Sequence, residues 1–255
     1  MRSRRLDSLT WPEVRDAIAR GAGAVLPVGA TEQHGPHLPI CTDALLAADL
    51  AEAVAEPLDL LVCPAIAYGY RSRPLSGGGP SFPGTLSLSG RTLMAVVEDV
   101  LAELIRHGFR RLVLLSWHYE NTNFVYEAAW LAQERCAGND ARILVHEDPG
   151  GAPSDAVMEE LFHGDFPGWD AEHAAIVETS LMLHLHREMV LFDRAVDDRS
   201  PRHPGYDVVP PPADFVAPSG TLWKATQATA EKGKLVWDEA VASVIEDIRT
   251  ELPPR

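Results

Sequence analysis

Short apolar runs alternate along the chain with longer segments in which apolar residues recur every three or four positions. The short runs have the composition of buried strands and fall at 24–29, 60–66, 111–117 and 142–146. Helical periodicity or helix-start signals lie near residues 8–12, from Thr42, over 91–107, after His118, over 172–186 and over 221–252. This alternation predicts an α/β fold, a three-layer αβα sandwich with a mainly parallel central sheet.

Length and composition narrow the class of protein. With 255 residues, 46% hydrophobic and 23% charged, the chain has the make-up of a globular enzyme, and we expect residues 1–255 to form a single domain. The net charge of −15 disfavours a nucleic-acid partner. Three cysteines without CxxC spacing indicate neither a disulfide framework nor a thiolate zinc site, which fits a cytoplasmic protein. No apolar stretch indicates export or a membrane partner.

Two stretches show neither strand nor helix periodicity. The stretch 68–90 is rich in glycine, proline and serine, and it is too long for a plain connection in a compact domain. It is therefore a candidate functional loop. The Pro-rich stretch 201–219 predicts an irregular surface arm.

Candidate metal ligands follow two of the predicted strands. They are imidazole and carboxylate side chains: Glu32, His34, His37, Asp43, His118 and Glu120. Ligands of open parallel sheets bind beyond the carboxyl ends of the strands, so the two segments that carry these residues can converge. Carboxylates and imidazoles without a thiolate suit Zn²⁺ or Mn²⁺ in a hydrolytic site.

The spacing within this set favours a metal site over solvated loop residues. Glu32 and His34 stand two apart, as do His118 and Glu120, so an extended backbone points each pair to one side. An aspartate such as Asp43 can bridge two ions about 3.5–4 Å apart, which together activate water and polarise a carbonyl. We therefore predict two divalent ions, Zn²⁺ or Mn²⁺, and leave His37 out because it can instead brace the loop.

Five segments resemble, in order and spacing, the creatininase (creatinine amidohydrolase) family. They are PVGATEQHGPHLPICTD, YGYRSRPLSGGGPSFPGTLSL, SWHYENTNFVYEA, GWDAEHAAIVETSLML and SGTLWKATQATAEKG. The resemblance covers residues 24–235. The first motif is similar to the whole superfamily, which includes formamide deformylases and the peptidase of mycofactocin maturation. The HYEN, SGGG and WDxxH segments resemble the creatininase branch, which points to creatinine as the substrate.

The resemblance implies a metal centre of defined composition. Glu32, Asp43 and His118 would hold one ion, often manganese or zinc. His34, Asp43 and Glu120 would hold a zinc, with Asp43 as the bridge. A hydroxide shared by the ions would attack the ring carbonyl of creatinine, and cleavage of the cyclic amide would give creatine.

The resemblance also implies catalytic and substrate-binding residues. His173 corresponds to the family's catalytic histidine, which shuttles the proton, although a packing histidine at a helix start is the alternative. Glu120 is a second candidate catalytic residue. The residues that match substrate contacts in the family are Ser76, Tyr119, Trp169, Asp170 and His173. An indole face packs on a planar guanidine-like ring, and a carboxylate accepts hydrogen bonds from its nitrogens.

Several roles stay open at this level. The glycines at 77–79 are either part of the site or a flexible turn, and Trp169 either contacts substrate or fills a surface groove. Glu172 and Glu178, on one predicted helix, either orient catalytic groups or form salt bridges.

One departure from the family bears on the substrate. The family's lid carries a tryptophan that closes over the ring, yet this sequence has none between Trp130 and Trp169, and residues 148–155 are DPGGAPSD. We therefore expect a different lid, and the alternative function is hydrolysis of another small cyclic amide, formamide or peptide. A non-enzymatic metal-dependent subunit is a third alternative. The candidate proton shuttle and aromatic platform disfavour it, because a purely structural metal site needs neither. The resemblance also implies a homohexamer.

Overall fold

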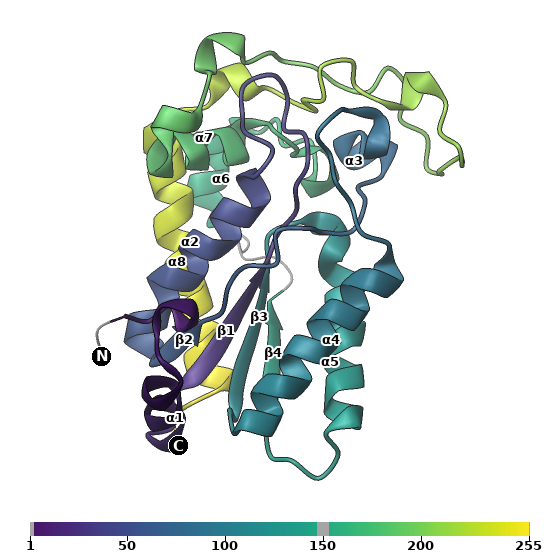
Figure 1. Cartoon of the computed structure of the whole chain (residues 1–255). Coiled ribbons are helices and arrows are strands. Elements are labelled where there is room, and N and C mark those ends of the chain that lie inside the picture. Colours follow the sequence, from purple (N-terminus) through teal and green to yellow (C-terminus); the bar gives the residue numbers. More distant parts are fainter. Residues whose placement is uncertain (1–2, 147–152, 255) are drawn as a thin grey trace.

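The computed structural model describes residues 3–146 and 153–254. Its sheet has four parallel strands in the order β2-β1-β3-β4 (Figure 1). They are β1 (Gly23–Val28), β2 (Leu60–Val62), β3 (Arg111–Ser116) and β4 (Arg142–His146). Every residue of the two central strands, β1 and β3, is buried, as their continuous apolar runs predict.

The second strand is shorter than predicted. Its regular part ends at Val62 rather than at residue 66, because Pro64 has no N–H to donate to the neighbouring strand. The chain nevertheless stays beside β1: the N–H groups of Cys63 and Ile66 donate to the carbonyls of Val25 and Pro27 at 2.9 and 3.0 Å. The other three strands lie within one residue of their predicted bounds.

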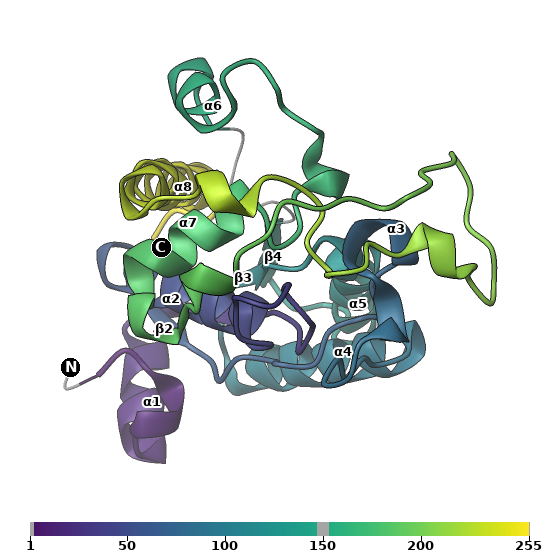
Figure 2. The ribbon, with the colours of Figure 1, turned by 90° about the horizontal axis from the view of Figure 1, so that it is seen from above.

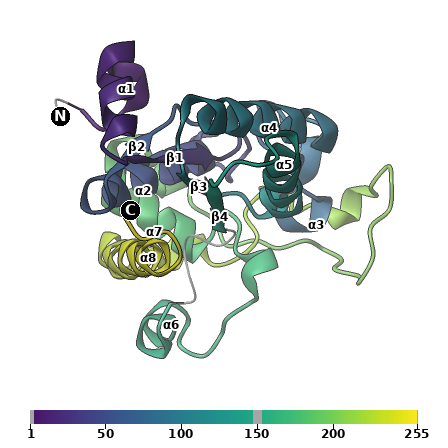
Figure 3. The ribbon, with the colours of Figure 1, turned by 90° about the horizontal axis from the view of Figure 1, so that it is seen from below.

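Helices cover both faces of the sheet, as seen from above and below in Figures 2 and 3. One face carries α1 (Trp11–Ala19), α4 (Gly90–His107) and α5 (Thr122–Arg135). The other carries α2 (Thr42–Leu58), α7 (Ile176–Leu185) and α8 (Ala230–Glu251). Two short helices, α3 (Pro74–Gly77) and α6 (Asp155–Phe162), lie outside these layers.

Successive side chains along a strand pack alternately into two separate hydrophobic cores, one on each face of the sheet. Val113 and Leu115 of β3 pack with α2, α7 and α8, whereas Leu112 and Leu114 pack with α1, α4 and α5. The predicted three-layer αβα sandwich is therefore confirmed. None of the described helices is both long and apolar enough to span a bilayer.

Helix α7 begins four residues later than the predicted helix at 172–186. Ala174 has a φ of +52°, and the side chains of Glu172 and Glu178 accept hydrogen bonds from the N–H groups of Val177 (2.9 Å) and Ala174 (2.7 Å). These carboxyl groups satisfy N–H groups at and before the first turn. Burial and the nearby Glu178 raise the pKa of Glu172 to about 8, so Glu172 accepts as the neutral acid at neutral pH. The prediction that Glu172 and Glu178 share one helix was thus wrong, since Glu172 precedes α7.

The carboxyl ends of the strands carry the long loops (Figure 1). The loop after β1 leads directly into α2, and Gly29 permits this, because a Cβ there would lie 2.5 Å from the backbone of Ala44. The stretch 68–90 crosses the same end and contains α3. The arm at 201–219 is irregular apart from a single 3-10 turn (Ala213–Phe215), as predicted.

Candidate metal centre

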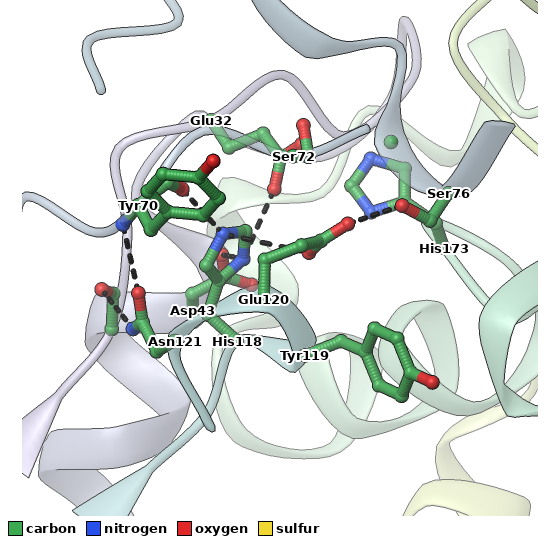
Figure 4. Close-up of polar contacts among 12 residues, drawn as sticks. Glu32, Asp43, Tyr70, Ser72, Ser76, His118, Tyr119, Glu120, Asn121 and His173 are labelled. Carbon is green, nitrogen blue, oxygen red and sulfur yellow. Dashed lines mark hydrogen bonds and ion pairs between the residues drawn. The ribbon is translucent and has the colours of Figure 1, made fainter. Parts of the chain in front are cut away.

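Four of the five predicted metal ligands meet at the carboxyl end of β1 and β3. Glu32 and His34 lie in the loop after β1, Asp43 in the first turn of α2, and His118 two residues beyond β3. Asp43 lies between the two histidines: its Oδ1 is 3.0 Å from His34 Nε2 and its Oδ2 is 3.1 Å from His118 Nδ1. Glu32 Oε2 is 3.2 Å from the same His118 nitrogen (Figure 4). All four side chains are buried.

Backbone carbonyls orient both imidazoles. His34 Nδ1 lies 3.1 Å from the carbonyl oxygen of Glu32, and His118 Nε2 lies 2.8 Å from that of Tyr70. A carbonyl only accepts, so these two nitrogens carry hydrogens. The opposite nitrogens therefore face the carboxylates, as in histidines that bind metal and donate their other N–H to a backbone oxygen.

The chemistry of this cluster fits two divalent ions. Glu32 Oε1 is buried with no hydrogen-bond partner among the described residues, and His34 Nε2 and Asp43 Oδ2 face only other would-be ligands. Buried polar groups are normally paired, so unpaired carboxylate and imidazole atoms facing one another indicate a place for cations. Two sets of would-be ligands share Asp43, one with Glu32 and His118 and the other with His34 and Glu178, and a third set joins Glu32, His34 and His173.

The fifth predicted ligand, Glu120, lies to one side of this cluster. It belongs to none of the ligand groups found among residues 3–146 and 153–254. Its Oε1 accepts hydrogen bonds from the Arg73 N–H (3.1 Å) and the Ser76 hydroxyl, and its Oε2 is 3.6 Å from His118 Nε2. The role of Glu120 as a ligand stays a prediction.

Glu178 is a candidate ligand, whereas the sequence interpretation gave it only as an orienting carboxylate or a salt-bridge partner. Its Oε2 is 3.6 Å from His34 Nε2. Sequence spacing gave no signal for it, because Glu178 and His34 come from distant segments. Its place in the same motif as His173, five residues further on, was the only pointer.

A cavity of about 300 Å³ opens on the cluster. It is lined by Asp43 and His118 together with all the residues predicted to contact substrate: Ser76, Tyr119, Trp169, Asp170 and His173. Its volume is at the lower end of the range for small-molecule sites. Trp169 packs edge-on against Phe166, with ring centroids 4.9 Å apart. The structure thus gathers these side chains at one cavity, and their contact with substrate stays a prediction.

Comparison with known proteins agrees with this arrangement. The family model for creatininase, creatinine amidohydrolase, matches residues 7–248. The chain belongs to the creatininase family. A creatinine amidohydrolase of Pseudomonas putida is 45% identical over 251 residues, which cover 96% of each chain. A mycofactocin precursor peptide peptidase of Mycolicibacterium smegmatis is 32% identical over 91% of this chain and 86% of the relative.

Solved creatininase structures share the fold over nearly the whole chain. A glutamate-to-glutamine mutant complexed with creatine has a TM-score of 0.95 and 42% identity, and covers 99% of this chain and 100% of its own. A Zn-Zn form of such a mutant has a TM-score of 0.94 and 42% identity and covers 100% of both chains. A manganese form has a TM-score of 0.93 and 41% identity, and covers 99% of this chain and 100% of its own. The predicted family is therefore confirmed.

The SGGG segment of this creatininase-family chain packs tightly against the cluster, which argues against a merely flexible turn. Gly77 is buried, and a Cβ there would lie 2.3 Å from Glu32 Oε1 and 2.9 Å from Ser72 Oγ. Only a residue without a side chain leaves Glu32 in its present position.

Replacing Gly77 by alanine is expected to displace the Glu32 carboxylate and lower metal occupancy, with activity reduced about tenfold or more. Elemental analysis and a turnover assay of the purified variant measure both effects. Gly205→Ala is the matched control, because a Cβ at Gly205 meets no atom within 4 Å. Full metal occupancy in Gly77→Ala would contradict this account of the segment.

The charges of the cluster shift the pKa values of its members in the absence of ions. Burial lowers the pKa of His34, but the carboxylates of Asp43 and Glu178 raise it by more, so the pKa lies well above its ordinary value. The pKa of His118 is likewise raised, against burial, by Glu32 and Asp43. Both imidazoles are therefore protonated near neutral pH in the ion-free protein. Protons occupy the places where cations fit.

Binding of zinc near pH 7 is consequently expected to release protons, about two per chain, because ligating imidazoles must be neutral. Titration calorimetry in buffers of different ionisation enthalpy measures this release. The same shifts stabilise the ion-free fold below the ordinary imidazole pKa, and that contribution is lost as pH rises through the raised values. A binding heat independent of the buffer would contradict the protonation state deduced for His34 and His118.

His37 contacts α7 rather than the cluster. Its Nε2 lies 2.8 Å from Thr179 Oγ1, and the Leu191 N–H donates to its backbone carbonyl at 2.8 Å. Burial, together with the charge of His34, lowers the pKa of His37 to about 4, so it is neutral. These contacts favour the interpretation that His37 braces the loop.

The predicted difference in the lid falls on a segment that the structure largely leaves out. Residues 147–152 of the stretch 148–155 lie outside the described residues. The expectation of a lid that differs from the family pattern therefore stays a prediction.

Proposed function

We propose that this chain is a metal-dependent amidohydrolase that opens the cyclic amide of creatinine to give creatine. The position of Asp43 between two oriented histidines, beneath a small cavity, is the observation that carries the proposal. The 45% identity with a creatinine amidohydrolase over 96% of both chains supports creatinine as the substrate. The structures of relatives in Zn-Zn and manganese forms support zinc or manganese as the metal.

The ligand roles follow from the geometry of the cluster. Glu32 and His118, with Asp43, would hold one ion, and His34, with Asp43, would hold the other. Either Glu178 or Glu120 would complete the second set. When bound, such a pair of ions supplies an activated water at neutral pH and positive charge that stabilises the developing oxyanion.

The remaining side chains of the cavity bind the ring and move the proton. Asp170 would accept hydrogen bonds from the amino and imino groups of creatinine, and Trp169 would pack on its planar face. His173 would take up the proton of the attacking water and return it to the ring nitrogen that leaves. Ser76 and Tyr119 would complete the wall that faces the substrate.

Incubating zinc- or manganese-loaded protein with creatinine and measuring creatine tests the proposal. We expect turnover, its loss after chelation, and its recovery when metal is added back. A panel of formamides, lactams and short peptides runs in parallel. Turnover of one of these without turnover of creatinine would assign a related amidohydrolase, and inactivity on every compound would favour a non-enzymatic metal-dependent subunit.

One observation keeps peptides as a second candidate substrate class. A further cavity of about 400 Å³ shares Ser76, Tyr119 and Asp170 with the first and extends it towards the arm, at Tyr206. This gives room beyond a single small ring. The 32% identity with a mycofactocin precursor peptide peptidase also supports a peptide substrate. A higher kcat/KM for a peptide than for creatinine would favour this alternative.

We further propose that the protein is a cytoplasmic homohexamer, as the family resemblance suggests. Tyr126 and Trp130, exposed one turn apart on α5, provide apolar surface of the kind that subunit contacts bury. Sedimentation at a mass six times that of the chain would support the hexamer, and a monomer at the same concentration would contradict it.

A further inference from the structure

The side chain of Gln33 lies in the interior between three loops. It is 5% exposed and directly follows the would-be ligand Glu32. Its Nε2 donates to the backbone carbonyls of Gly77 (2.9 Å) and Gly220 (3.0 Å), and its Oε1 accepts from the N–H of Gly35 (2.9 Å). One amide therefore joins the metal-ligand loop, the SGGG segment and the turn at Gly220.

These partners fix which way the amide points. Two carbonyl oxygens can only accept and a backbone N–H can only donate, so the NH₂ group must face Gly77 and Gly220 and the oxygen must face Gly35. The opposite orientation would place oxygen against two oxygens. Both amide hydrogens of Gln33 are consequently used.

The same residue meets the imidazole of His173. His173 Nε2 lies 2.9 Å from the backbone carbonyl of Gln33 and 3.0 Å from the side-chain Nε2 of Gln33. The carbonyl only accepts, and the amide nitrogen has no hydrogen left to donate. If His173 Nε2 carries a hydrogen, it donates that hydrogen to the Gln33 carbonyl. If Nε2 carries none, its lone pair faces a lone pair of the carbonyl oxygen, which is repulsive. Nε2 therefore carries a hydrogen, and in the neutral tautomer Nδ1 is the nitrogen without one.

From this juxtaposition we infer that Gln33 is a positioning residue that fixes the tautomer of His173, so that Nδ1 is the nitrogen that exchanges protons with the substrate. This inference rests on the proposed function, which makes His173 the proton shuttle. Among the described residues no hydrogen bond involves Nδ1 of His173, and the residue lines the cavity. Nδ1 is thus free to take up the proton of the attacking water and return it to the leaving nitrogen of the ring.

Neighbouring contacts hold the ring and its backbone in place. The His173 ring lies against that of His34, with centroids 4.4 Å apart, and the Leu222 N–H donates to the carbonyl of His173 at 3.1 Å. Gly220 has a φ of +83°, and a Cβ there would lie 1.9 Å from Gln33 Oε1. The turn at Gly220 is therefore shaped to admit the amide.

A neutron crystal structure of the zinc-loaded enzyme, exchanged into D₂O at about pH 8, tests the tautomer directly. We expect deuterium on Nε2 of His173 and none on Nδ1. Deuterium on Nδ1, with or without Nε2, would overturn the inference. This result does not depend on creatinine turnover, so the inference and the proposed function can fail separately.

Gln33→Met keeps the length of the side chain and removes the amide that ties Gln33 to Gly77 and Gly220, and so tests whether these ties hold the Gln33 carbonyl against His173 Nε2. We expect kcat to fall about tenfold or more while metal content and the KM for creatinine stay within about twofold. The matched control is Gln133→Met, which removes an amide that donates to the Ala141 carbonyl far from the cavity and should leave kcat unchanged. An unchanged kcat in Gln33→Met, loss of metal in that variant, or an equal loss in both variants would contradict the positioning role.

Discussion

Replacing Asp43 by alanine is expected to lower the metal content from two ions per chain to one or none, and to reduce creatinine hydrolysis about 10⁴-fold or more. Asp43 places one carboxylate oxygen against each histidine, Oδ1 against His34 and Oδ2 against His118. Without it each ion would lose a ligand, and the two imidazoles would lose the negative charge between them. Elemental analysis of the purified variant and an assay for creatine measure the two effects.

Asp49→Ala is the matched control on the same helix. Asp49 is an aspartate of α2 that pairs with His186 rather than with the cluster. We expect this variant to keep both ions and its activity, which separates the loss of the bridge from the loss of any carboxylate on α2. An Asp43→Ala protein that keeps two ions would show that Asp43 is not the shared ligand.

Replacing His173 by alanine is expected to lower kcat by about 10²–10⁴-fold while the metal content stays near normal. His173 lines the cavity and belongs to neither ligand set that shares Asp43, although a third possible group joins it to Glu32 and His34. With the ions in the two sets that share Asp43, its removal takes away the proton shuttle and no ligand. Kinetics and elemental analysis of the same preparation test both halves of this expectation. His107→Ala, an exposed histidine on α4, is the control that should change neither quantity.

Glu120→Ala provides the contrast to His173→Ala. If Glu120 is a ligand as the family resemblance implies, this variant loses metal as well as activity. Normal metal content in Glu120→Ala, with metal loss in Glu178→Ala, would assign the second ligand set to Glu178 instead. Equal metal loss in Glu120→Ala and His173→Ala would overturn the separate roles proposed for these two residues.

The layers of the fold could be predicted from the sequence because each strand carries a strong local signal. The apolar runs at 24–29 and 111–117 form β1 and β3 within one residue, and both are buried on each face. The candidate ligands after these runs meet for the same reason, since parallel strands end at one edge of the sheet. Local pattern and topology together were enough to place Glu32, His34, Asp43 and His118.

The rest of the site depends on contacts between segments that are distant in sequence. Helix α7 begins after Glu172 because two carboxyl groups bind N–H groups near its start, which the helical periodicity of 172–186 does not show. The closeness of Glu178 to His34 follows from the packing of α7 against the loop after β1. Gln33 had no signal at all, because its partners come from the segments around Gly77, His173 and Gly220.

Anomalous X-ray diffraction from zinc-loaded crystals tests the central claim most directly. We expect two zinc peaks per chain, one on each side of Asp43, the first beside Glu32 and His118 and the second beside His34. The second peak would also show whether Glu178 or Glu120 completes its ligand set. A single peak, or zinc bound away from Asp43, would contradict the shared metal centre on which the proposed hydrolysis depends.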